Sequence, residues 1–114
     1  MAGDTGALLQ GTLGLLILKA LVARERHGYG IARWIEAVSG DALRIEEGSL
    51  YPALRRLEDR GLVTSRWAVT ENNRRARFYA LSRAGRAHLE ADAGTWMHFA
   101  QAVTLVLRAE PAVV

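Results

Sequence analysis

The sequence contains no cysteine, which excludes both a disulfide scaffold and a thiolate metal site. It also has no long uninterrupted apolar run. The longest run, between Leu13 and Ala23, is broken by Gly14 and Lys19 and is too short to span a bilayer. No basic flank precedes this run and no convincing cleavage site follows it, so it is a poor secretory signal. These absences predict a cytoplasmic protein.

Lysine is almost absent, because Lys19 is the only lysine among 15 basic residues. The other 14 are arginines, whose planar guanidinium groups match the geometry of phosphate and guanine. A GC-rich genome would also raise the arginine content. The net charge is only +3, so the positions of the arginines say more about a nucleic-acid partner than their total does. At 114 residues, the chain is expected to form a single core.

Residues arranged for catalysis or metal binding are lacking as well. Of the three histidines, only His88 has a carboxylate one helical turn away, that of Asp92, and two donors do not complete a metal site. We find no Ser-His-Asp arrangement, no glycine-rich phosphate loop after a strand and no acidic pair in a predicted cleft. The sequence therefore predicts no enzymatic activity, no metal and no cofactor. His27 is expected to cap a helix or to contact phosphate beside Tyr29.

Hydrophobic periodicity and capping residues predict a mainly α fold with a small β-hairpin. Helices are expected from Thr12 to about Arg24, over residues 29–39, and over residues 83–108 after the N-cap Ser82. Another helix, capped by Gly48 or Ser49, should stop at Gly61 with Pro52 in its first turn. Strands are expected over residues 62–69 and 76–81, with a single edge strand over 43–46. Residues 1–10 are expected to begin disordered, with 7–10 helical.

The helix that stops at Gly61 separates its apolar and basic residues. Its core face is formed by three leucines at helical spacing, Leu50, Leu54 and Leu57. Arg55 and Arg56 fall on the opposite face, in the half of the helix that usually meets base edges in DNA-binding proteins. The alternative is an ordinary solvated surface on which Arg55 pairs with Asp59.

The predicted hairpin that follows this helix has a basic tip. Asn72 and Asn73 suit the turn, because asparagine tolerates positive φ. A turn does not require Arg74 or Arg75, so we expect these arginines to contact phosphate or the minor groove. A basic helix followed at once by a basic β-ribbon is the arrangement of a winged helix-turn-helix.

The last helix carries a long apolar stripe that a small core cannot easily cover. Either it folds back onto its own domain, or it packs against its copy in a second subunit, which we favour. Trp96 is expected to form part of that contact, or alternatively to be the flat aromatic wall of an effector site. The stripe expected to form the dimer contact consists of Leu89, Ala93, Trp96, Met97, Ala100, Val103 and Leu107.

Several segments resemble the PadR family of bacterial transcriptional regulators. They are Gly-Thr-Leu at 11–13, His-Gly-Tyr-Gly-Ile at 27–31, Gly-Ser-Leu-Tyr-Pro-Ala-Leu at 48–54, Leu-Glu at 57–58 and Glu-Asn-Asn-Arg-Arg-Ala-Arg-Phe-Tyr at 71–79. Leu-Ser-Arg-Ala-Gly-Arg at 81–86 resembles the family's entry into its C-terminal helix. The short C-terminal region is similar to the smaller subgroup with a single C-terminal helix. Gly14 departs from the acidic or polar helix former that is usual there.

The resemblance implies a winged helix-turn-helix DNA-binding domain over residues 8–81 and a C-terminal dimerisation helix over residues 82–108. It implies a homodimeric repressor that binds a near-palindromic operator and responds to a small-molecule effector at the dimer region. The alternative is a winged-helix module that binds protein or RNA. The residues expected to serve DNA binding are Tyr29, Ser49, Tyr51, Arg55, Arg56, Asn73, Arg74, Arg75 and Arg77.

Overall fold

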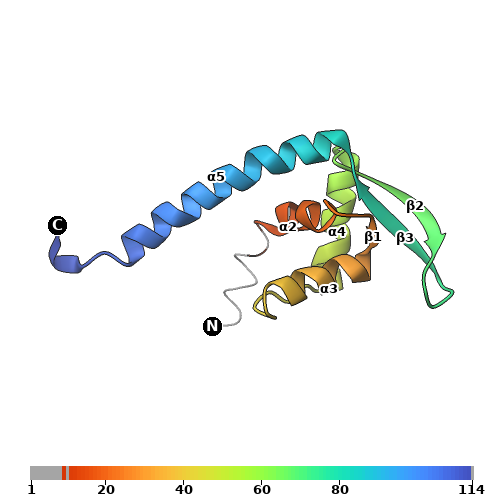
Figure 1. The fold of residues 1–114 in the computed structure, drawn as a ribbon, viewed down its shortest axis with the longest axis horizontal. Coiled ribbons are helices and arrows are strands. Elements are labelled where there is room, and N and C mark those ends of the chain that lie inside the picture. Colours follow the sequence, from red (N-terminus) through yellow and green to blue (C-terminus); the bar gives the residue numbers. More distant parts are fainter. Residues whose placement is uncertain (1–8, 10, 114) are drawn as a thin grey trace.

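In the computed structural model, a long C-terminal helix extends away from a body of helices and antiparallel strands (Figure 1). The structure describes residue 9 and residues 11–113. The expected disorder and helicity of residues 1–10 fall almost entirely outside the described residues. β3 (Arg75–Leu81) lies between β1 (Arg26–His27) and β2 (Val63–Val69) and pairs antiparallel with both. The expected fold class is confirmed. The elements are α2 (Leu13–Ala20), β1 (Arg26–His27), α3 (Gly28–Val38), α4 (Glu47–Asp59), β2 (Val63–Val69), β3 (Arg75–Leu81), α5 (Arg83–Leu107) and the 3-10 helix η1 (Pro111–Val113).

The core lies where α2, α3 and α4 meet the inner end of the sheet. Ile17 from α2, Ile31 from α3 and Leu54 from α4 are each at most 1% exposed. Burying an aliphatic side chain of this size stabilises the fold by about 1.5–3 kcal/mol. Val63 and Tyr79 carry the core onto the sheet, and Leu89 adds the first turns of α5. The winged body and the base of α5 therefore share one core.

The edge strand is formed by a different segment from the one expected. α2 ends at Ala20, not near Arg24, and the chain then enters β1, where Arg26 pairs with Tyr79. The Arg26 Nε donates to the carbonyl of Ala20 at 2.7 Å, which helps to end the helix and aim the chain at β3. The prediction of a strand over residues 43–46 is wrong, because this segment is held in the connection between α3 and α4.

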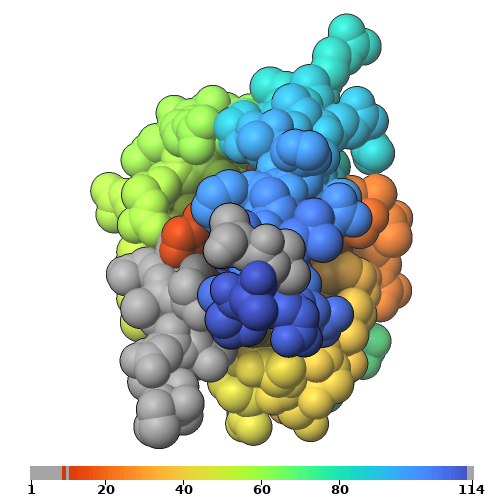
Figure 2. Space-filling view, turned by 90° about the vertical axis from the view of Figure 1, so that its left-hand side faces the viewer, coloured from red at the N-terminus to blue at the C-terminus, as the bar shows by residue number. Residues whose placement is uncertain are grey.

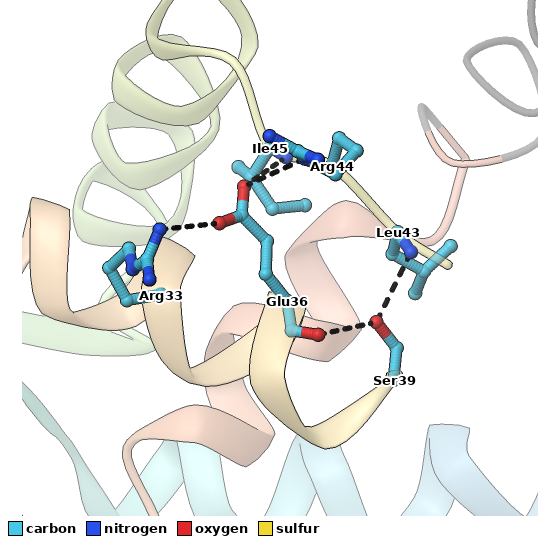
Figure 3. A network of polar contacts seen from close by, with 6 residues as sticks. All are labelled: Arg33, Glu36, Ser39, Leu43, Arg44 and Ile45. Atoms are coloured by element: carbon cyan, nitrogen blue, oxygen red, sulfur yellow. Dashed lines mark hydrogen bonds and ion pairs between the residues drawn. The ribbon is translucent and has the colours of Figure 1, made fainter. Parts of the chain in front are cut away.

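Polar contacts around Glu36 hold that connection in place (Figure 3). A Glu36 carboxylate oxygen accepts a hydrogen bond from the backbone N–H of Ile45 at 3.0 Å. The Ser39 hydroxyl donates to the Glu36 carbonyl and accepts from the Leu43 N–H, both at 3.1 Å. The backbone N–H groups of Leu43 and Ile45 are thus bonded within the connection, which fixes α4 relative to α3. The guanidinium groups of Arg33 and Arg44 flank the Glu36 carboxylate at 3.7 and 4.0 Å.

The start of α4 also differs from expectation. Its N-cap is Glu46 rather than Gly48 or Ser49, because the Ser49 N–H already bonds to the Glu46 carbonyl at 3.0 Å. Pro52 consequently lies in the second turn and not in the first. Its missing N–H leaves the Gly48 carbonyl without a helical partner, and Gly48 is exposed, so water is available to that carbonyl. The predicted stop at Gly61 is confirmed by its φ of +76°.

The junction between β3 and α5 is tight. Ser82 is the N-cap of α5, as predicted: its hydroxyl accepts from the Gly85 N–H at 2.9 Å and donates to the Gly61 carbonyl at 2.7 Å. Gly85 lies so close to the residue before β2 that an added Cβ would overlap the Leu62 carbonyl oxygen. The glycine therefore lets α5 start directly on the winged body. Among the described residues, no helix combines the length and hydropathy that crossing a membrane requires.

Candidate nucleic-acid interface

The outer face of α4 presents two exposed guanidinium groups. Leu54 and Leu57 are buried, which confirms the predicted core face, and Arg55 and Arg56 are exposed on the other side. Within the described residues, neither arginine forms an ion pair or a side-chain hydrogen bond, and the alternative pair between Arg55 and Asp59 does not form. Both cations are thus available to an external anion or hydrogen-bond acceptor.

Tyr51 connects the start of α4 with the first turn of α3. A Cβ on Gly28 would fall 2.7 Å from the Tyr51 hydroxyl oxygen, so the tyrosine occupies the space that this glycine leaves open. Burial raises the pKa of Tyr51, and the nearby Glu47 carboxylate raises it further. The hydroxyl therefore stays protonated at neutral pH and is able to donate a hydrogen bond. The Tyr51 side chain is still 44% exposed, and Ser49 is exposed beside it.

The first turn of α3 carries the exposed ring of Tyr29. His27 caps this helix, which is one of the two roles predicted for it: its Nδ1 accepts a hydrogen bond from the Gly30 N–H at 3.0 Å. The same imidazole stacks on the Tyr29 ring at a centroid distance of 6.3 Å and meets Phe78 of β3 edge-on at 5.2 Å. Tyr29 thus packs against His27 on one side, and 65% of its surface is exposed to solvent.

The hairpin between β2 and β3 closes on Asn73. Its φ is +61°, which confirms a structural reason for asparagine there, whereas Asn72 is not in the left-handed region. Two hydrogen bonds close the turn. The Thr70 N–H donates to the Arg74 carbonyl at 2.7 Å, and the Arg74 N–H donates to the Thr70 hydroxyl at 3.2 Å. The exposed Arg74 side chain has no partner within the described residues. The turn that carries this side chain is thus closed by hydrogen bonds between Thr70 and Arg74.

The other arginines of the hairpin are held by neighbours. Trp67 of β2 lies between two of them, with its ring centroid 5.0 Å from the Arg75 guanidinium carbon and 5.6 Å from that of Arg77. Arg77 also donates from Nε to the Ser65 hydroxyl at 2.9 Å and pairs with Glu58 of α4 at 3.5 Å. Trp67 is 54% exposed. Trp67 was not among the predicted site residues. An aromatic residue in a predicted strand gives no sign in the sequence that it will contact these two arginines.

A groove of about 680 Å³ separates the hairpin from the start of α3. Burial lowers the pKa of Arg26, which lines it, and the neighbouring Arg24 lowers it further, as expected where cations crowd together. Glu25 also lines the groove, but its carboxylate is paired with Arg66 at 2.6 Å. The arginines of the groove are Arg24, Arg26, Arg33, Arg74 and Arg75. Three of them, Arg24, Arg26 and Arg33, were missed from the sequence because they precede or lie within α3, far from the hairpin in the chain.

The predicted DNA-binding residues lie on three elements that contact one another. α4 meets α3 through Tyr51 and Gly28, and it meets the hairpin through Glu58 and Arg77. α3 meets the hairpin through its N-cap His27, whose ring packs edge-on against Phe78 of β3. We refer to the outer face of α4, the first turn of α3 and the β2–β3 hairpin together as the three-element surface.

The residues predicted for dimerisation divide into two groups along α5. Leu89 is only 7% exposed and belongs to the core of its own domain, and Ala93 packs partly against that core. Further along, Trp96, Met97 and Leu107 are exposed, and Leu107 reaches 79%. Figure 2 views the molecule from the side on which α5 ends, with this C-terminal part of the chain in blue in front of the body. The remaining predicted members are Ala100, which is partly buried, and Val103, which is exposed.

A second groove, of about 510 Å³, lies between α2 and α5. Leu15 and Leu18 of α2 face Trp96 and Phe99 of α5 across it. The His88 imidazole, which also lines it, lies 2.8 Å from the Asp92 carboxylate, as their spacing predicted. In the described part of the chain, no group of three or more histidine, aspartate or glutamate residues is placed to hold a metal ion.

Comparison with known proteins identifies relatives of this fold. Residues 17–91 match the model of the transcriptional regulator PadR-like family. A PadR family transcriptional regulator from Eggerthella lenta is 26% identical, with a TM-score of 0.77 and coverage of 95% of this chain and 92% of that one. PadR from Bacillus subtilis, solved in complex with operator DNA, is 26% identical, with a TM-score of 0.63 over 70% of this chain and 45% of that one. A 37.1 kDa protein of transposon TN4556 from Streptomyces fradiae is 44% identical over 79 residues, which are 69% of this chain but only 21% of that protein.

Proposed function

The chain belongs to the PadR-like family of transcriptional regulators, and from this premise we propose that it is a homodimeric repressor that binds a near-palindromic DNA operator. Membership of this family makes the protein a DNA-binding regulator with a winged helix-turn-helix and not an enzyme. The proposal adds the oligomeric state, the form of the operator, the direction of regulation and the residues that make each contact.

The observation that carries the proposal is the pair of exposed arginines on α4. A helix fits the major groove, where arginine donates two hydrogen bonds to the O6 and N7 of guanine. Arg55 and Arg56 have no partner within the described residues, so binding DNA would break no existing ion pair. The buried leucines on the other face of α4 hold the helix firmly on the body. We assign base reading to these two arginines.

Contacts with the DNA backbone are assigned to the two elements beside α4. Arg74 and Arg75 at the hairpin, with Asn73 and Arg77, would follow the phosphates or the minor groove. Ser49 and Tyr51 at the start of α4 and Tyr29 on α3 offer hydroxyl groups, which suit phosphate oxygens. The operator complex of Bacillus subtilis PadR supports this use of a similar winged domain.

Dimerisation is assigned to the outer part of α5. Its exposed apolar side chains would form a large patch on a monomer, and such patches usually mark interfaces. Residues 8–81 would form the DNA-binding domain and residues 82–108 the dimerisation helix, anchored to the body by Leu89 and Ala93. Trp96, Met97, Ala100, Val103 and Leu107 would then meet the partner. Two α4 helices related by a two-fold axis would read the two halves of a near-palindrome.

A small-molecule effector would act at the same helix. The groove between α2 and α5 has aromatic walls in Trp96 and Phe99, and a ligand bound there would shift α5 relative to the winged body. The alternative role for Trp96 is that of a simple dimer contact. Titration of tryptophan fluorescence with planar aromatic compounds, in the wild type and in Trp96→Leu, separates the two roles.

A mobility-shift assay tests the proposed function. The full chain is first used to enrich duplexes from a random-sequence library, and its affinity for the enriched duplex and for a shuffled one is then measured over a salt series. A DNA-binding regulator prefers the enriched duplex and loses affinity steeply with salt. A winged-helix module that binds protein or RNA would enrich no duplex.

A further inference from the structure

The Arg77 guanidinium is held on one edge and one face. Its Nε donates to the Ser65 hydroxyl at 2.9 Å, and its Nη2 lies 3.5 Å from a Glu58 carboxylate oxygen. The Trp67 ring lies against the group, with the guanidinium carbon 5.6 Å from the ring centroid. The remaining nitrogen, Nη1, has no partner within the described residues. The Arg77 side chain as a whole is 42% exposed.

The contacts form a relay between two parts of the three-element surface. The Ser65 hydroxyl, which accepts from Arg77, itself donates to the same Glu58 oxygen at 2.6 Å. Glu58 lies on α4, Ser65 on β2 and Arg77 on β3. The carboxylate therefore joins the helix to both strands of the hairpin. Charge-assisted hydrogen bonds of this kind are about twice as strong as neutral ones and fix a planar guanidinium in one orientation.

We propose that Glu58 is a positioning residue for DNA binding: directly and through Ser65, it holds Arg77 so that Nη1 points outward to the DNA. This inference rests on the proposed function. A long arginine side chain loses conformational freedom when it binds, and a chain already held in place loses less. Glu58 thus favours binding although its own charge repels phosphate.

The sign of one substitution separates positioning from simple electrostatics. Removing an acidic group near phosphates should strengthen DNA binding if charge alone matters. Removing a group that holds an arginine in place should weaken binding. Asp59 provides the matched control, because it is the next residue of α4, is exposed and has no ion pair within the described residues.

The experiment compares Glu58→Met, Glu58→Gln and Asp59→Asn on the duplex enriched by the wild-type full chain. We expect Glu58→Met to bind on the order of tenfold more weakly, the cost of losing one charged hydrogen bond. Glu58→Gln should recover part of this loss, because its amide oxygen still accepts from Ser65 and Arg77. Asp59→Asn should bind as tightly as the wild type or more tightly.

A double-mutant cycle shows whether Glu58 acts through Arg77. In an Arg77→Ala background, Glu58→Met should cause no further loss of affinity. An equal loss in both backgrounds would overturn the inference, and so would a Glu58→Met variant that binds as tightly as Asp59→Asn. If Glu58→Met does not fold, as judged by thermal melting, Ser65→Ala replaces it, since it breaks the same relay on a surface strand.

The outcome also distinguishes this inference from the proposed function. If the wild type enriches no duplex, the proposed function fails and the role of Glu58 fails with it. If the wild type enriches a duplex and Glu58→Met binds it normally, the repressor remains and only the positioning role is overturned.

Discussion

Arg55 and Arg56 are the residues on which DNA sequence reading depends in this account. Arg55→Ala and Arg56→Ala should each reduce the preference for the enriched duplex over a shuffled one, because each arginine–guanine pair contributes about 1–3 kcal/mol of discrimination. Non-specific affinity should fall much less. The measurement is the ratio of the two affinities at one salt concentration. Unchanged ratios in both variants would mean that this face of α4 does not read bases.

Gly85 is expected to affect the stability of the fold and not DNA binding directly. Gly85→Ala would make a Cβ overlap the Leu62 carbonyl oxygen, so α5 or the residue before β2 must move, and overpacking of this kind costs about 1–3 kcal/mol. Gly48→Ala is the matched control, because nothing lies within 4 Å of its added Cβ. That variant should gain roughly 0.5–1 kcal/mol, since alanine is favoured over glycine in a helix. Chemical denaturation compares the two, and equal stability would refute the close approach.

At the scale of elements, the hairpin is expected to contribute affinity for any sequence. Arg74→Ala and Arg75→Ala should each weaken binding to enriched and shuffled duplexes alike, and should reduce the slope of log affinity against log salt by about one. Arg108→Ala serves as the control, because Arg108 follows α5 at the end of the molecule away from the hairpin (Figure 1). A slope that stays at the wild-type value in both hairpin variants would place the tip away from DNA.

Elements determined by local chemistry were predictable from the sequence, and those determined by distant partners were not. The leucine face of α4, the Ser82 cap and the left-handed Asn73 depend on neighbours in the chain. β1 is only two residues long and exists because β3 offers it an edge. The start of α4 shifted to Glu46 because Glu36, ten residues earlier, holds the preceding loop.

The candidate site was predictable to a similar degree. The sequence indicated the arginines of α4 and of the hairpin tip, because charge and turn residues are visible in a linear pattern. It did not indicate that Arg24 and Arg33 face the hairpin across a groove. Nor did it show that Trp67 and Glu58 hold Arg77, since these contacts join residues of three different elements.

For the whole molecule, assembly through α5 is the decisive expectation. Val103→Asp would bury an unpaired charge in the proposed interface, at a cost of about 3–5 kcal/mol, which weakens dimerisation more than a hundredfold. Gln101→Asp is the control, because it lies more than 90° around α5 from Val103 by helical spacing and is exposed. Sedimentation velocity should find monomers for the first variant and dimers for the second. A wild-type chain that sediments as a monomer at micromolar concentration would contradict the dimer.

The central claim is that this chain reads a specific DNA sequence with its three-element surface. The most direct test is the affinity of the full chain for its enriched duplex and for the same duplex with shuffled sequence, measured at matched salt concentrations. The account predicts a preference of about a thousandfold or more, with affinity for both duplexes falling as salt rises. Equal affinity for the two duplexes at every salt concentration would contradict it.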